Sequence, residues 1–154
     1  MKNLNKITQL CFFCLLSLVF NVAYSEPTLK LIDGTELPIS HFKGQWVVIN
    51  YWASWCAPCQ HEIPELNKFY LEHKKINTVL FAVNYDGVTL NEQRSLASQF
   101  KLLYPSLGQD PSAYLGFGDI RGIPATFVIN PEGKLVKTLY GEQTAKSLAK
   151  VVQS

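Results

Sequence analysis

The chain has 154 residues, of which 47% are hydrophobic and 17% are charged, and its formal net charge is only +2. This composition is typical of a single globular domain and excludes an intrinsically disordered chain. Because no cluster of Lys or Arg stands out, nucleic acid is not expected as a partner.

The first 25 residues have the composition of a secretory signal peptide. Lys2 and Lys6 precede an apolar run over Leu10–Phe20, and small residues follow at the two positions that an A-x-A-type cleavage site requires. The run is shorter than the roughly 20 apolar residues that span a membrane. We therefore expect export and removal of residues 1–25, with a retained N-terminal membrane anchor as the alternative. The domain would then comprise residues 26–154, with 12 basic and 12 acidic residues.

Export would leave two of the four cysteines. Cys11 and Cys14 lie within the apolar run, where cysteine behaves as a small hydrophobe. Cys56 and Cys59 would remain, and a bridge between them would close a loop too short to remove much chain entropy. A structural disulfide framework normally uses several bridges, so this pair is poorly explained as a staple.

Segments with strand and helix patterns alternate along the rest of the chain. In one predicted helix, Leu96, Phe100 and Leu103 share a face. The order of the elements predicts an α/β fold with a mixed central sheet. We expect, in chain order, a buried strand over Trp46–Tyr51, a helix from Cys59 to about His73, a buried strand over Asn77–Tyr85, a helix over Asn91–Leu102, loops around a short helix near Pro111–Leu115, a strand over Ala125–Ile129, a turn over Asn130–Gly133, an antiparallel strand over Lys134–Tyr140 and a helix over Glu142–Val152.

The motif Cys56-Ala57-Pro58-Cys59 admits three interpretations: a redox dithiol, half of a zinc site, or a haem-attachment site. Covalent haem attachment requires C-x-x-C-H, but Gln60 occupies the place of the histidine. A zinc site needs four ligands, and His41, His61 and His73 stand at no recognisable metal spacing. The residue inventory therefore favours the redox dithiol, with no bound cofactor and no metal.

The motif lies just after a buried strand and at the start of a predicted helix. Unpaired N–H groups and a partial positive charge at a helix N-terminus stabilise a thiolate, which is the attacking species in thiol–disulfide exchange. Pro58 suits the first helical turn, where its missing N–H would have no intrahelical partner. We predict that Cys56 attacks a substrate disulfide, and that the more buried Cys59 resolves the mixed disulfide by attacking Cys56.

Three segments carry further motifs. They are "WCAPCQHEIPEL", with Glu62 and Pro64 after the dithiol, "GIPATFVINPEGKLV" over Gly122–Val136, and "DGTELPISHFKGQ" over Asp33–Gln45. In this order, they resemble the active-site turn, the cis-proline signature and the N-terminal hairpin of the thioredoxin superfamily, specifically of its exported TlpA, ResA and CcmG/DsbE branch. The likeness extends over nearly all of Thr28–Val152.

The resemblance implies a thioredoxin-like three-layer fold with a central mixed β-sheet flanked by helices, an N-terminal β-hairpin and a central insertion over Val88–Gly118. It also implies that Pro124 is a cis-proline facing the dithiol, with an ordinary turn proline as the alternative. The backbone of Ile123 would then be free to pair with an extended substrate segment. Trp55, directly before Cys56, is expected as an apolar contact for protein substrates.

Asn50 stands six residues before Cys56, where cytoplasmic thioredoxins carry a buried aspartate. An asparagine cannot accept the proton of Cys59. Glu62 shares a helix face with Cys59 and is the candidate substitute, because desolvation would raise its pKa toward the thiol range. The alternative is a glutamate that only stabilises the helix dipole.

The resemblance implies a periplasmic thiol–disulfide oxidoreductase that mainly reduces protein disulfides, including those of apocytochrome c before haem attachment. Its electrons would come from a membrane-embedded reductase of the DsbD or CcdA kind. The motif does not fix the direction of transfer, since about 30 mV corresponds to 1.4 kcal/mol for two electrons. Two alternatives stay open: a thiol peroxidase of the same fold, although Asn50–Ala53 lacks the P-x-x-x-T-x-x-C context, and a non-catalytic module that binds metal or haem through its thiols.

Overall fold

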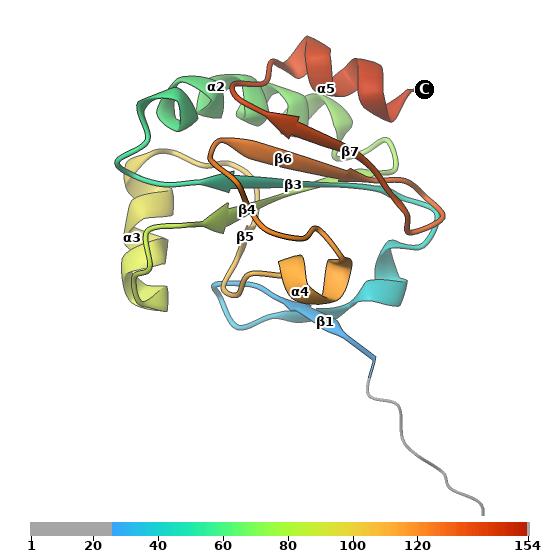
Figure 1. Ribbon diagram of the computed structural model, residues 1–154, viewed down its shortest axis with the longest axis horizontal. Coiled ribbons are helices and arrows are strands. Elements are labelled where there is room, and N and C mark those ends of the chain that lie inside the picture. Colours follow the sequence, from blue (N-terminus) through green and yellow to red (C-terminus); the bar gives the residue numbers. More distant parts are fainter. Residues whose placement is uncertain (1–25, 154) are drawn as a thin grey trace, which may run out of the picture.

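The structure is a computed structural model that describes residues 26–153 (Figure 1). The predicted signal segment, with Cys11 and Cys14, lies outside the described residues. The elements are β1 (Thr28–Lys30), β2 (Glu36–Pro38), the 3-10 helix η1 (Ile39–Phe42), β3 (Trp46–Trp52), α2 (Ala57–His73), β4 (Thr78–Asn84), α3 (Leu90–Gln99), β5 (Ser106–Leu107), α4 (Ser112–Leu115), β6 (Ala125–Ile129), β7 (Leu135–Tyr140) and α5 (Ala145–Val152).

A five-stranded sheet in the order β5-β4-β3-β6-β7 forms the middle layer. The strands β3, β4 and β5 are parallel, whereas β6 is antiparallel to both β3 and β7. Figure 1 shows α2 and α5 on one face of the sheet, and the β1–β2 hairpin with α4 on the other. This arrangement confirms the α/β fold with a mixed sheet and an N-terminal hairpin.

The central strand β3 is buried on both faces, as its nearly continuous apolar sequence predicts. Its side chains alternate between two hydrophobic clusters, with Val48 and Trp52 on the α2 side and Val47, Ile49 and Tyr51 on the hairpin side. Because β3 pairs with β4 and β6 along its length, its carboxyl end is fixed in the middle of the sheet. The dithiol motif follows directly from that end.

Helix α2 begins at Ala57, two residues earlier than predicted. Cys56 is its N-cap residue, and the Cys59 N–H donates to the Cys56 sulfur at 3.3 Å. Pro58 stands in the first turn as expected, whereas Pro64 lies inside the helix, which nevertheless continues to His73.

Helix α3 ends at Gln99 rather than Leu102. One of the three residues predicted to share its apolar face does not belong to it. Phe100 packs against the core as predicted, but Leu103 lies beyond the helix and is 53% exposed. The helix stops because Lys101 adopts a left-handed conformation with φ of 56°. From α2, the Asn67 side chain donates to the Lys101 carbonyl at 2.9 Å and accepts from the Leu103 N–H at 2.8 Å, which holds this turn.

Helix α5 begins at Ala145 rather than at the predicted Glu142. Thr144 caps it by accepting from the Ser147 N–H, which excludes the preceding residues from the helix. Two further differences concern the sheets. The strand β5 was not predicted, because two residues are too few to show a period, and the first strand of the hairpin precedes the segment Asp33–Gln45.

Within residues 26–153, no helix is long and apolar enough to cross a membrane.

The packing of α2 against the sheet can be tested with two leucines of the same helix. Leu66 is fully buried, whereas Leu71 is half exposed. We expect Leu66→Ala to lower the free energy of unfolding by about 2–5 kcal/mol, because it leaves a cavity between α2 and the sheet. Leu71→Ala should cost less than about 1 kcal/mol. Urea unfolding of both variants checks this, and equal losses would contradict the packing described here.

Candidate active site

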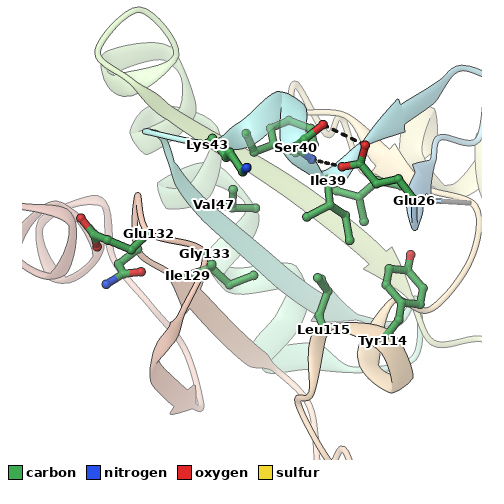
Figure 2. A pocket seen from close by; sticks show the side chains of 13 residues that line it. Glu26, Ile39, Ser40, Lys43, Val47, Tyr114, Leu115, Ile129, Glu132 and Gly133 are labelled. Atoms are coloured by element: carbon green, nitrogen blue, oxygen red, sulfur yellow. Dashed lines mark hydrogen bonds between the residues drawn. The ribbon is translucent and has the colours of Figure 1, made fainter. Parts of the chain in front are cut away.

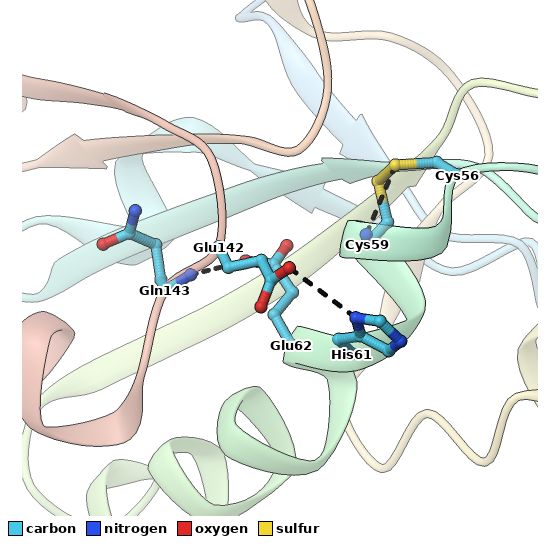
Figure 3. Close-up of polar contacts among 6 residues, drawn as sticks. All are labelled: Cys56, Cys59, His61, Glu62, Glu142 and Gln143. Atoms are coloured by element: carbon cyan, nitrogen blue, oxygen red, sulfur yellow. Dashed lines mark hydrogen bonds and ion pairs between the residues drawn. A yellow bond between two sulfur atoms is a disulfide. The ribbon is translucent and has the colours of Figure 1, made fainter.

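Cys56 and Cys59 form a disulfide across the first turn of α2, with their Cα atoms 5.3 Å apart (Figure 3). Cys56 is 5% exposed and Cys59 is fully buried. Both cysteines are thus buried, and Cys59 is the more buried of the two. This difference in burial agrees with the division of roles predicted for the two residues.

The turn that precedes the disulfide is held from two sides. The backbone N–H and the hydroxyl of Ser54 donate to the Asp86 carboxylate, at 3.0 Å and 2.6 Å. On the other side, the Gln60 side chain donates to the Ser54 carbonyl at 2.6 Å. Trp55, the next residue, is 67% exposed and stands beside Cys56. The clamp from Asp86 was not predicted, because only the fold brings the loop after β4 next to this turn.

Glu62 lies on α2 one turn beyond Cys59 and is almost completely buried. One carboxylate oxygen, Oε1, accepts from the Asn50 Nδ2 at 2.7 Å, and the other, Oε2, accepts from the Gln143 N–H at 2.8 Å. Burial raises the pKa of Glu62 to about 7, although both hydrogen bonds favour the carboxylate and act against this rise. A carboxyl with such a pKa can both bind and release a proton near neutrality.

The loop between β7 and α5 is fastened to α2 next to this carboxyl (Figure 3). Besides the bond from Gln143 to Glu62, the Ala145 N–H donates to the Glu65 carboxylate at 2.9 Å. At the surface, the His61 ring lies 3.7 Å from the Glu142 carboxylate. Gln143 was missed from the sequence, because it acts through its backbone and any residue with an N–H could do the same.

The segment before β6 contains the predicted cis-proline. Pro124 is buried, its peptide bond with Ile123 is cis, and its carbonyl accepts from the Gly141 N–H at 2.9 Å. Ile123 is half-buried and packs against the same hydrophobic cluster that contains Cys56 and Cys59. Ile123 and the dithiol thus share one hydrophobic cluster, although more than 60 residues separate them along the chain.

Other features of the described residues lie away from this site. No group of three or more His, Cys, Asp or Glu among residues 26–153 is arranged to hold a metal ion. A pocket of about 500 Å³ lies on the hairpin side of the sheet, between η1, α4 and the turn after β6 (Figure 2). Its walls include Phe42, Val47 and Ile129, and a bond from Ser40 to Glu26 stands at its edge. Neither cysteine lines this pocket.

Residues 23–138 match the AhpC/TSA family, and the chain belongs to that family. It is 31% identical to the sporulation thiol-disulfide oxidoreductase A of Bacillus subtilis over 122 residues, which cover 78% of this chain and 73% of that protein. It is 27% identical to the thiol-disulfide oxidoreductase ResA of Bacillus cereus, over 79% of this chain and 70% of the relative.

Solved structures agree with this assignment. The crystal structure of StoA from Bacillus subtilis superposes with a TM-score of 0.67 at 28% identity, over 80% of this chain and 93% of that one. A thiol:disulfide interchange protein of the thioredoxin family from Chlorobium tepidum gives a TM-score of 0.66 at 25% identity, over 83% and 92%. The protein is a thiol–disulfide oxidoreductase of thioredoxin fold.

The buried carboxyl predicts how stability depends on pH. The pKa of Glu62 is about 7 in the folded protein against 4.5 for an exposed glutamate, so between these values the folded state binds more protons than the unfolded state. The free energy of unfolding should therefore fall by about 3 kcal/mol as the pH rises from 4.5 to 7. In Glu62→Gln this contribution should vanish. Urea unfolding of both oxidised proteins across this range measures the difference, and parallel pH profiles would contradict the assignment.

Proposed function

We propose that the protein is an exported oxidoreductase that reduces protein disulfides in the periplasm, with Cys56 as the nucleophile. The observation that supports this most is the placement of the two sulfurs. The Cys56 sulfur caps α2 and belongs to the less buried of the two residues, whereas Cys59 is fully buried. The relatives named above are thiol-disulfide oxidoreductases, which supports the same chemistry here.

The cycle starts from the dithiol. The Cys56 thiolate attacks one sulfur of a substrate disulfide, which forms a mixed disulfide and releases the other substrate sulfur as a thiolate. The Cys59 thiolate then attacks the Cys56 sulfur, closes the Cys56–Cys59 disulfide and releases the second substrate thiolate. Two electrons pass from the dithiol to the substrate. A membrane-embedded reductase of the DsbD or CcdA kind would return the protein to the dithiol form.

The helix start lowers the energy of the Cys56 thiolate. Its sulfur lies where the first turn of α2 presents unpaired N–H groups, and the Cys59 N–H already points at it. The same contacts therefore favour the form of Cys56 that attacks the substrate disulfide.

Glu62 supplies the proton transfer that Asn50 cannot. Cys59 attacks only as a thiolate, and a buried carboxylate one turn away on the same helix can accept its proton. A pKa near 7 keeps part of the Glu62 population ionised at neutral pH, ready to accept a proton.

Substrate contact would come from the surface around Cys56. Trp55 offers a large exposed ring, and the backbone of Ile123, beside Pro124, would pair with an extended substrate segment. We further propose that the clients include apocytochrome c, whose haem-binding cysteines must be reduced before haem attachment. A thiol peroxidase is less well supported, because Ala53 stands where the threonine of the peroxidatic motif would be.

The proposal is tested with the reduced protein and an oxidised peptide that contains C-x-x-C-H. Wild type should reduce the peptide, Cys56→Ser should be inactive, and Cys59→Ser should accumulate the mixed disulfide, because nothing resolves it. Intact-mass spectrometry after acid quenching detects each species. A glutathione titration of the Cys56–Cys59 pair gives its reduction potential. A potential near that of DsbA, about −120 mV, would overturn the reductive direction, and peroxide consumption at a comparable rate would favour the peroxidase.

The role of Glu62 has its own kinetic test. In Glu62→Gln the Cys59 thiol loses its proton acceptor, so resolution of the mixed disulfide should slow by about 10²-fold or more, whereas attack by Cys56 stays nearly unchanged. Stopped-flow measurement of the two steps separates them. Glu65→Gln, three residues further along the same helix, serves as the control and should leave the rate of resolution unchanged. Unaltered resolution and an unaltered Cys59 titration in Glu62→Gln would refute the role.

A further inference from the structure

The partners of Asn50 are all on one side of its amide. Asn50 is fully buried on β3, and its Nδ2 donates to Glu62 Oε1 at 2.7 Å and to Thr126 Oγ1 at 3.2 Å. Thr126 is the residue directly opposite on β6. Among the described residues, the Asn50 Oδ1 is buried and accepts no hydrogen bond. The amide is therefore held through its nitrogen alone.

This orientation suits only one protonation state of Glu62. A carboxylate accepts the N–H of Asn50, but a carboxylic acid carries a proton that itself needs an acceptor. A half-turn of the Asn50 amide about its Cβ–Cγ bond would exchange the positions of Nδ2 and Oδ1. The Oδ1 could then accept from the acid and from the Thr126 hydroxyl, since a hydroxyl can donate as well as accept.

We propose that Asn50 is a positioning residue for both states of Glu62: its Nδ2 holds the carboxylate, and after the amide turns over, its Oδ1 accepts the proton carried on Glu62 Oε1. This rests on the proposed role of Glu62 as a proton carrier. Asn50 cannot accept the proton of Cys59, but in this proposal it positions the residue that does.

The two donors to Glu62 decide which oxygen takes the proton. The Gln143 donor is a backbone N–H, which cannot become an acceptor, so Oε2 keeps this bond in either state. The Asn50 amide can present either end, so the proton goes to Oε1. Turning the amide breaks no third hydrogen bond, because the Oδ1 has none to lose, and it places the Nδ2 where the Oδ1 now lies without a partner. The contacts with Glu62 and Thr126 are broken and remade with their directions reversed.

Among residues 26–153, no hydrogen bond joins Glu62 Oε1 to another ionisable group. Burial places the pKa of Glu62 at about 7, so both states are populated near neutrality. Two of the neighbouring groups interact with Glu62 electrostatically: Glu142 raises the pKa of Glu62, and the pKa of Tyr104 is itself raised by burial and by Glu62. The others have partners of their own. Glu65 accepts from the Ala145 N–H, His61 pairs with Glu142 at the surface, and Cys56 and Cys59 form the disulfide.

The test is a pH titration of the oxidised wild-type protein by NMR, in which the cysteines do not titrate. The carboxyl carbon of Glu62 and the side-chain amide of Asn50 should move with the same midpoint. Nuclear Overhauser contacts between the Nδ2 protons and Thr126, present above the midpoint, should be lost below it. Contacts that persist on both sides, or an Asn50 amide that does not follow Glu62, would overturn the proposal. This outcome is independent of whether Glu62 exchanges protons with Cys59, which the kinetics of Glu62→Gln decide.

A pair of variants gives a second measurement. Asn50→Asp replaces the amide donor by a carboxyl group, and two carboxyl groups in contact share one proton, so the midpoint of Glu62 should rise by at least about 1 pH unit. Asn91→Asp makes the same chemical change on exposed α3 and keeps the acceptor for Arg94, so the midpoint should stay in place. An unshifted midpoint in a folded Asn50→Asp contradicts the contact. If that variant does not fold, the wild-type titration still decides.

Discussion

The site depends on a single buried carboxyl and the two donors that hold it. Glu62 is enclosed between α2, the central strand and the β7–α5 loop, where an ion without partners would be too costly to keep. One donor comes from Asn50 in the middle of the sheet, and the other from the backbone of Gln143. Because the two bonds only partly offset the cost of burial, the pKa of Glu62 stays raised, at about 7, and its proton is bound and released near neutrality. That balance is what general acid–base chemistry near neutral pH requires.

The disulfide depends on the same framework in a different way. The paired neighbours of β3 fix its carboxyl end, Asp86 and Gln60 hold the turn at Ser54, and α2 then starts with Cys56 as its cap. Electrostatic stabilisation of a thiolate requires that the sulfur stay within the first turn of the helix. The rigid approach from the strand therefore matters as much as the cysteines themselves.

Much of this could be predicted from the sequence, for identifiable reasons. The strands Trp46–Trp52 and Ala125–Ile129 are long apolar runs between turn residues, and the C-x-x-C motif has few chemical interpretations once its neighbours are considered. The predicted C-terminal end of α3 and the predicted start of α5 were wrong, because side-chain hydrogen bonds and a helix cap fix them. Asn67 holds the turn after α3, and Thr144 and Glu65 fix the start of α5. The roles of Gln143 and Asp86 were beyond prediction, because both depend on which loops the fold places side by side.

The fastening of the last helix to α2 has a consequence for how the domain can be divided. Glu62 and Glu65 accept from the backbone N–H groups of Gln143 and Ala145 at the start of α5, so the C-terminal helix is tied to the redox centre. A chain cut after Gly141 would retain both cysteines, the cis-proline and every letter of the motif. It would nevertheless remove the Gln143 N–H that donates to Glu62, and it would expose the Glu62 carboxyl to water. The smallest fragment that keeps the Glu62 site intact must therefore include the β7–α5 loop and α5, and not only the segments that carry the sequence motifs.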